Sequence, residues 1–126
     1  MSEPTSGREP IVRYRDATDS TSCPHGEVLR VVTGGDGGVA NVHVVSVTRG
    51  GAHVHEGYDE VYYVLEGTGT LTMAGEDHAL RPGAVAVVPR GVPHAVEADD
   101  GRPIEFIIFG VPGMPISDAA ARPRKP

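Results

Sequence analysis

The chain has 126 residues, enough for one domain with a real hydrophobic core but not for two. Its formal net charge is -6 with neutral histidines, and it contains no Trp. The negative charge argues against a surface that binds DNA or RNA, and without Trp a stacking platform for bases is not expected. We therefore expect no nucleic-acid partner.

Cysteine usage and the ends of the chain indicate the compartment. Cys23 is the only cysteine, which excludes an internal disulfide and fits a reducing compartment. Residues 1–10 are polar and lack the apolar stretch of a signal peptide, and apolar runs such as 106–109 are far too short to span a bilayer. We expect a cytoplasmic protein with no membrane partner.

The predicted organisation of the chain is a flexible N-terminal arm at 1–10, one β-barrel domain at 11–116 and a disordered basic tail at 117–126.

Glycine and proline separate short Val- and Ile-rich runs along the chain. The sequence holds 17 Gly and 11 Pro with only 5% aromatic residues, a composition that favours short strands joined by tight turns. No stretch has a defensible helical pattern, and there is no internal repeat. The predicted fold class is all-β, a jelly roll or small barrel. The predicted strands span residues 28–33, 40–48, 51–55, 60–66, 69–73, 77–80, 84–88, 94–98 and 104–109.

Several of the predicted strands are apolar on both faces. Residues 61–65, 84–88 and 104–109 lack the alternation that is typical of strands with one face in water. Their outer face therefore needs a cover. A strand at 11–14 is a candidate for part of this cover and a second copy of the chain for the rest, so we expect a homodimer.

Four potential metal ligands are the most informative feature of the sequence. His53 and His55 are two positions apart, so on a strand their side chains point to the same side and can reach one ion together. A turn through residues 57–59 lets Glu60 come back towards them, and His94 follows in a second block. Three imidazoles and one carboxylate hold a divalent metal and leave positions open for water, substrate or oxygen.

The spacing of these residues resembles the two motifs of the cupin superfamily, in its small single-domain microbial form. The first motif is matched from His53 onward, with four residues between His55 and Glu60 and six between Glu60 and Gly67. The matches to the second motif are Gly83, Pro89, Gly91 and His94.

The sequence departs from the family pattern at two places. Ala98 stands where the second motif has Asn, and Gly50 and Gly51 lie closer to His53 than the leading glycine of the first motif. Neither departure touches the four metal ligands. The resemblance implies a conical β-barrel of two antiparallel sheets, a six-coordinate metal in its interior and a substrate that enters at the wider mouth.

The resemblance also implies the cofactor and a range of functions. One divalent transition metal is expected, iron first, with manganese, nickel, copper, cobalt and zinc as alternatives. Because three histidines and one carboxylate with open positions suit oxygen chemistry, we expect a dioxygenase or other oxidoreductase that acts on a small polar or anionic metabolite. The alternatives are a non-redox isomerase, lyase or cyclase, and a non-catalytic cupin that binds a sugar-like small molecule.

Two further residues are candidates for catalysis. Tyr62 shares the face of Glu60 by the period of two, so its phenol is a candidate hydrogen-bond donor or acid, with a buried core aromatic as an equal alternative. His43 lies in the predicted strand 40–48 and is a candidate proton shuttle, although a satisfied or half-exposed strand histidine is the commoner outcome. Alternation directs Asp59 away from the site if Glu60 points into it.

The remaining polar candidates carry weaker signals. Arg49 and Arg90 flank the two motifs and are candidate clamps for an anionic substrate, although such residues are more often rim charges. His78 follows a predicted hairpin turn and is expected to be exposed. Cys23 and His25 are too isolated to predict a redox or zinc site, unless the N-terminal segment folds over the barrel mouth.

Overall fold

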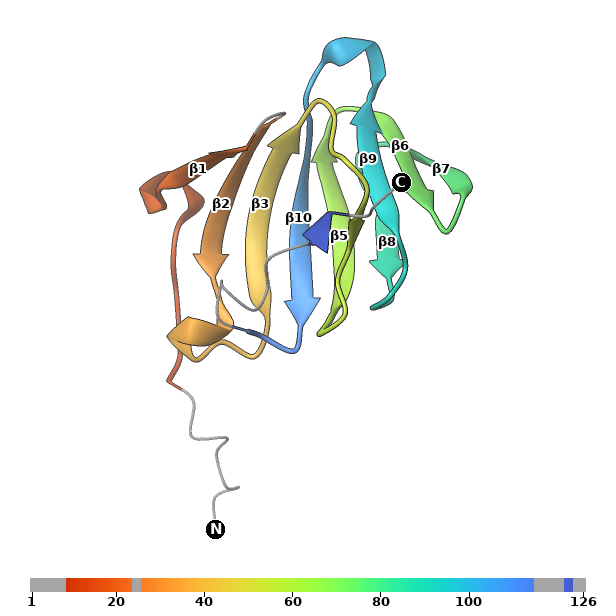
Figure 1. Cartoon of the computed structure of the whole chain (residues 1–126). Helices are drawn as coiled ribbons and strands as arrows, with labels where there is room; N and C mark the ends of the chain where they lie inside the picture. Colours follow the sequence, from red (N-terminus) through yellow and green to blue (C-terminus); the bar gives the residue numbers. More distant parts are fainter. Residues whose placement is uncertain (1–8, 24–25, 115–121, 124–126) are drawn as a thin grey trace.

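Two antiparallel β-sheets packed face to face make up the protein, which confirms the predicted all-β fold class (Figure 1). The computed structural model describes residues 9–23, 26–114 and 122–123. The first sheet has the strand order β1-β2-β3-β10-β5-β8 and the second the order β11-β4-β9-β6-β7. The strands are β1 (Ser20–Cys23), β2 (Gly26–Val32), β3 (Asn41–Val47), β4 (His53–Val54), β5 (Asp59–Glu66), β6 (Gly69–Met73), β7 (Glu76–Leu80), β8 (Val85–Val88), β9 (His94–Ala98), β10 (Ile104–Val111) and β11 (Arg122–Pro123). Among the described residues, three short 3-10 helices complete the list: η1 (Arg15–Ala17), η2 (Gly34–Asp36) and η3 (Asp99–Gly101).

Each of the nine predicted strands overlaps a strand of the structure, but the N-terminal region differs from the prediction. Residues 11–14 form no strand, and the sequence analysis missed β1, which pairs with β2 at the edge of the first sheet. The segment before β1 is held by side-chain contacts rather than by backbone pairing in a sheet. Arg13 donates to the Val31 carbonyl and to Asp36, both at 2.9 Å, and Arg15 donates to both carboxylate oxygens of Glu105.

Parts of the predicted termini lie outside the described residues. Residues 1–8 of the expected arm and most of the expected tail at 117–126 belong to this group. Within the tail, β11 pairs with β4 at the edge of the second sheet. None of the helices in the described part of the chain is long and apolar enough to cross a membrane.

The hydrophobic core fills the space between the two sheets. Strand alternation places Val64 of β5 and Phe106 of β10 inward, and the register sets Phe106 opposite both Val45 and Val64. Leu71 of β6 and Ile104 are fully buried at 0% exposure. Because residues paired across neighbouring strands share a face, this register defines which side chains of every paired strand point into the barrel.

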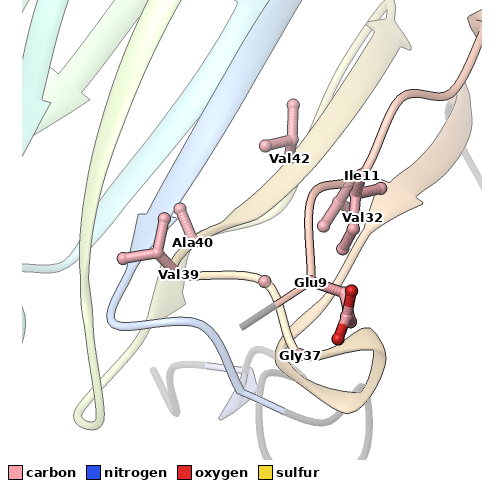
Figure 2. A pocket seen from close by; sticks show the side chains of 8 residues that line it. Glu9, Ile11, Val32, Gly37, Val39, Ala40 and Val42 are labelled. Carbon is pink, nitrogen blue, oxygen red and sulfur yellow. The ribbon is translucent and has the colours of Figure 1, made fainter. Parts of the chain in front are cut away.

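The outer face of the first sheet is apolar and partly open to solvent. Tyr63 is 43% exposed, and Val85 and Val87 of the neighbouring edge strand are more exposed still. A surface pocket of about 480 Å³ lies between the segment at Glu9 and Ile11 and the junction of β2 and β3. Figure 2 shows the side chains that line it. None of its lining residues is a candidate metal ligand, so the pocket is separate from the site described next.

Candidate metal centre

Three ligand groups converge inside the barrel. His55, directly after β4, Glu60 of β5 and His94 of β9 place their ligand atoms within 4.8 Å of one another. Nε2 of His55 lies 3.5 Å from Oε2 of Glu60, and Nε2 of His94 lies 3.3 Å from Oε1. Because β5 belongs to the first sheet and β9 to the second, the cluster forms only when the two sheets pack together.

Backbone and side-chain contacts bring the two sequence blocks together at this point. The Gly91 amide donates to the His55 carbonyl at 2.7 Å, which ties the first block to the turn before β9. Asp59 accepts hydrogen bonds from the backbone amide of Arg90 at 2.9 Å and from its Nε at 3.1 Å. Alternation along β5 then directs Asp59 outward and leaves Glu60 inward at 5% exposure, as the sequence predicted.

His94 is held in an orientation suited to metal binding. Its Nδ1 lies 3.0 Å from the Val92 carbonyl, which only an N–H can satisfy, so Nδ1 carries a proton and donates. Nε2 is then the ring atom that faces Glu60. Burial acts to lower the pKa of His94, but the hydrogen bond with Glu60 and the bond to Val92 outweigh it and raise the pKa.

His55 is oriented by a tyrosine in the same way. The hydroxyl of Tyr58 lies 2.6 Å from Nδ1 of His55, and the two rings are 4.7 Å apart. Tyr58 is only 4% exposed because its ring lies over Gly110 of β10, where a Cβ atom would come within 3.0 Å of it. Burial is the largest cause of the lowered pKa of His55, so the ring stays neutral and available as a ligand near neutral pH.

Glu60 is buried as a carboxylate with several partners. Tyr62 donates a hydrogen bond to its Oε1 at 3.1 Å. Burial acts to raise the pKa of Glu60, but the hydrogen bond with His94 and the charges of His55 and His94 outweigh it, and the pKa is lowered. An ionised, buried carboxylate beside two imidazoles is an arrangement that binds a divalent cation.

His53 lies beside this group rather than within it. It pairs with His94 across β4 and β9, and the two ring centroids are 6.3 Å apart, compared with 5.3 Å between His55 and His94. Burial is the main cause of its lowered pKa. The structure therefore brings three of the four predicted ligands together. Metal binding by the fourth, His53, stays a prediction.

The donor set fits a divalent transition metal. Two Nε2 atoms and a carboxylate converge, a third imidazole lies next to them, and the Nδ1 atoms of the two converging histidines are held by Tyr58 and the Val92 carbonyl. Imidazole and carboxylate ligands suit iron, manganese, nickel, copper and zinc. Outer hydrogen bonds of this kind fix the tautomer of a ligating histidine.

The two predicted catalytic residues lie on the same inner face. Tyr62 is 4% exposed, stacks on Phe106 with ring centroids 4.9 Å apart and contacts Glu60. His43 lies opposite Ile108, which in turn lies opposite Tyr62. Its Nε2 is buried and has no hydrogen-bond partner among the described residues.

The weaker candidates lie away from the cluster. Arg90 pairs with Asp59, and Arg49 is exposed where the chain forms an isolated bridge to Glu97. His78 is exposed on β7, as expected. Cys23 ends β1, and His25 lies outside the described residues.

Sequence reasoning missed the partner of His55. Tyr58 was assigned only to the turn before Glu60, although its position three residues after His55 places the two side chains within reach. A second signal was Gly110, a glycine within the apolar stretch from Ile107 to Val111, because glycine in a strand often marks a close approach of another group. The predicted strand ended at residue 109 and excluded it.

A match to a known family now identifies the class of the protein. Residues 40–110, more than half of the chain, match the family Cupin_2, described as cupin domain. The chain belongs to this family, so the resemblance seen in the sequence is confirmed. An oxalate-binding protein of Thermotoga maritima is 35% identical over 57 residues, which are 45% of this chain and 47% of that protein. The chain spans about half the length of the curated relatives it matches.

Solved structures share the fold at lower sequence identity. A predicted oxalate decarboxylase from Thermotoga maritima is 21% identical with a TM-score of 0.71, covering 80% of this chain and 98% of that chain. The polyketide cyclase RemF from Streptomyces resistomycificus is 20% identical with a TM-score of 0.72, covering 91% of this chain and 85% of that chain. At such identities the likeness establishes the jelly-roll fold and not the reaction.

Proposed function

We propose that this cupin is a metal-dependent enzyme that acts on a small polar or anionic metabolite. The observation that supports the proposal is the convergence of His55, Glu60 and His94 within 4.8 Å in the barrel interior. In the proposal His53 is the fourth donor, because it lies on the adjacent strand pair beside His94. Iron is the first candidate among the divalent transition metals that suit this donor set.

The residues around the cluster have distinct roles in the proposal. A bound divalent cation supplies a Lewis acid that polarises a substrate oxygen. Tyr62 holds the Glu60 carboxylate through its hydroxyl, and Phe106 stacks on Tyr62 and excludes water from that side. His43 lies on the same inner face and its Nε2 has no hydrogen-bond partner among residues 9–23, 26–114 and 122–123, so this atom can take a proton from substrate or return one to it.

Among the possible reactions, proton transfer has the better support. Nε2 of His43 is buried and has no partner among the described residues, which costs stability, so His43 is best explained by direct contact with substrate, as a hydrogen-bonding group that also transfers a proton in an isomerase, lyase or cyclase. The sequence alone favoured a dioxygenase, because of its three histidines and one carboxylate. The proposal now ranks proton transfer before oxidation. The oxidative reaction is the second candidate, because the same donor set with open positions suits oxygen chemistry.

The relative from Thermotoga maritima supports an anionic ligand. It is described as an oxalate-binding protein, and oxalate is a small dicarboxylate that can chelate a metal. The same description supports a third candidate, binding without turnover. In that case metal and a carboxylate ligand bind to the protein, but no substrate is converted.

Elemental analysis of tag-free protein purified without chelator tests the metal centre. We expect close to one transition-metal ion per chain, lost in the variants Glu60→Gln and His94→Ala. His78→Ala is the matched control, because it removes an exposed imidazole from β7 and should keep the metal. Protein that contains no metal and shows no thermal shift when metals are added would contradict the proposal.

Incubation of the metal-loaded protein with a panel of small carboxylic acids separates the reaction classes. Mass spectrometry of the products and an oxygen electrode are read in parallel. Unchanged mass, or loss of water or of a fragment, without oxygen consumption supports proton transfer, and His43→Gln should then slow turnover while metal content is kept. Products that gain oxygen atoms, with consumption of oxygen, would contradict proton transfer and support the oxidative reaction.

We further propose that the protein is a cytoplasmic homodimer. The single cysteine supports a reducing compartment. The outer face of β5 and β8 carries the side chains of Val61, Tyr63, Val85 and Val87, of which Tyr63, Val85 and Val87 are exposed. A two-fold interface needs one patch that complements itself, and an apolar sheet face of this kind satisfies the requirement.

A further inference from the structure

Arg30 of β2 faces the interior of the barrel and has no charged partner among the described residues. The register sets it directly opposite His43 of β3, on the face that further along the sheet carries Val45 and Phe106 of the core. Its side chain is half-buried. Within residues 9–23, 26–114 and 122–123, no carboxylate lies within ion-pair distance of its guanidinium.

Arg30 is close enough to the metal centre to act on its surroundings. Burial is the main cause of the lowered pKa of His43, and the charge of Arg30 is the next. A guanidinium that faces inward and has no counter-ion is unusual, because partly buried cations are normally paired.

A second polar group next to Arg30 also lacks a partner. Nε2 of His43 is buried and makes no hydrogen bond within the described part of the chain. Side chains directly opposite each other on neighbouring strands have Cβ atoms about 5 Å apart, so Arg30 and His43 can contact one small ligand together. The two groups offer several N–H donors and one positive charge, which is the complement of a carboxylate.

The strand register connects this pair to the candidate metal centre. Arg30, His43, Ile108 and Tyr62 form one inward-facing row across four neighbouring strands. Neighbouring strands are about 4.8 Å apart, so the row runs roughly 14 Å from Arg30 to Tyr62. Tyr62 contacts Glu60, and the charge of Glu60 acts on His43. A small molecule held by Arg30 and His43 thus extends along the row towards the cluster.

We propose that Arg30 and His43 form a carboxylate-binding subsite that sets the substrate class of the metal centre. The substrate is a small metabolite with a carboxylate at one end, paired bidentately with Arg30 and hydrogen-bonded by His43, and an oxygen donor at the other end that reaches the cluster of His55, Glu60 and His94. This inference rests on the proposed function for its metal-binding end only. The carboxylate end depends on Arg30 and His43 alone.

The structure favours Arg30 over the two arginines that flank the sequence motifs. Arg90 is already paired with Asp59 at 3.1 Å through its Nε, on the outer side of the turn. Arg49 is exposed, at the point where the chain forms an isolated bridge to Glu97. Of these three arginines only Arg30 faces the row that leads to Tyr62.

Calorimetric titration of oxalate, malonate, succinate and glutarate, with their uncharged diamides alongside, tests the subsite. The metal-loaded protein should bind at least one of the dicarboxylates and none of the diamides. Arg30→Gln should weaken that binding about tenfold or more, since it removes a charge-assisted bidentate pair. Arg30→Lys should restore only part of the affinity, because an ammonium group cannot form the planar fork. His43→Gln should weaken binding less than Arg30→Gln does.

Controls separate this subsite from folding and from the metal centre. Arg102→Gln removes an exposed arginine and should leave affinity unchanged. Arg30→Gln should keep its metal and its melting temperature, because Arg30 makes no ion pair within the part of the chain that the structure describes. Dicarboxylate affinity unchanged in Arg30→Gln, equal binding of the diamides, or no binding of any dicarboxylate would overturn the subsite.

The metal-free protein distinguishes the failure of this inference from the failure of the proposed function. Nuclear magnetic resonance titration with succinate should show weak binding that Arg30→Gln abolishes, whether or not metal is present. Absence of metal binding together with this Arg30-dependent succinate binding would contradict the metal-dependent function and leave the subsite supported. Metal binding without any Arg30-dependent carboxylate binding would overturn the subsite and leave the metal-dependent function supported.

Discussion

The hydroxyl of Tyr58 and Nδ1 of His55 lie 2.6 Å apart, although neither residue belongs to a long strand. With Nδ1 occupied, Nε2 of His55 is the atom that faces Glu60. His94 achieves the same orientation with a backbone carbonyl, that of Val92. Both imidazoles of the centre are therefore oriented by groups of the protein rather than by the metal, and one of these groups, the Tyr58 hydroxyl, can be removed by substitution.

Substitution Tyr58→Phe removes the hydroxyl and keeps the ring. We expect metal affinity to fall about 10- to 100-fold, because the orientation and tautomer of His55 are no longer fixed. Competition with a chromogenic chelator measures the change. Tyr63→Phe, an exposed tyrosine on the outer face of β5, is the control and should bind metal like the unmodified protein. Equal affinity in both variants would remove Tyr58 from the centre.

Substitution Gly110→Ala tests whether the position of Tyr58 matters as well as its hydroxyl. A Cβ at residue 110 would lie 3.0 Å and 3.1 Å from two ring atoms of Tyr58, so the ring must shift. We expect a loss of about 1–3 kcal/mol in the free energy of unfolding and weaker metal binding. Gly51→Ala is the control, because a Cβ there meets nothing within 4 Å. Urea unfolding and the chelator assay together report both effects.

The sequence predicted the parts of the fold and site that depend on local spacing. The period of two predicts that Asp59 and Glu60 point to opposite faces, and the structure confirms this. It also predicted one strand face for His53 and His55, but β4 ends at Val54 and His55 follows it. The turns at Gly and Pro separated the strands well enough for nine of the eleven strands in the described residues to be found. The family motifs then linked His94, far along the chain, to the first block.

The contacts that the sequence did not predict depend on pairing between distant strands. Whether Val44 or Val45 faces inward follows from the register of β3 with β10, and a shift by one residue reverses the answer. Arg30 was not considered for the same reason, since only its pairing with His43 places it inside the barrel. The strand β1 was missed because its sequence, Ser-Thr-Ser-Cys, has no apolar alternation and forms as an edge strand against β2.

Acid should weaken the attachment of the N-terminal segment. The hydrogen bonds from Arg15 lower the pKa of Glu105 below its ordinary value of 4.5. A carboxyl group with a lowered pKa in the folded state contributes stability above 4.5, and this contribution is lost as the pH falls through the lowered value. Both groups are partly exposed, so the pair is worth only about 0.2–1 kcal/mol.

The variant Glu105→Gln isolates this effect. We expect it to be slightly less stable than the unmodified protein at neutral pH and equally stable well below pH 4.5, where the carboxyl group is protonated in both states. Urea midpoints measured across this range report the difference. A gap between the two proteins that persists in acid would mean that Glu105 acts by packing rather than by charge.

The proposed dimer makes the outer face of the first sheet sensitive to charge. Val87 of edge strand β8 is 58% exposed and points outward beside Val61 and Tyr63. In a two-fold interface each substitution occurs twice, so Val87→Asp would bring two carboxylates into one apolar contact. We expect light scattering after gel filtration to give the mass of a dimer for the unmodified protein and of a monomer for Val87→Asp.

The control variant Ala79→Asp, on exposed β7 of the other sheet, should remain a dimer. An unmodified protein that is monomeric at micromolar concentration, or a Val87→Asp variant with the same mass as the unmodified dimer, would contradict an interface on this face.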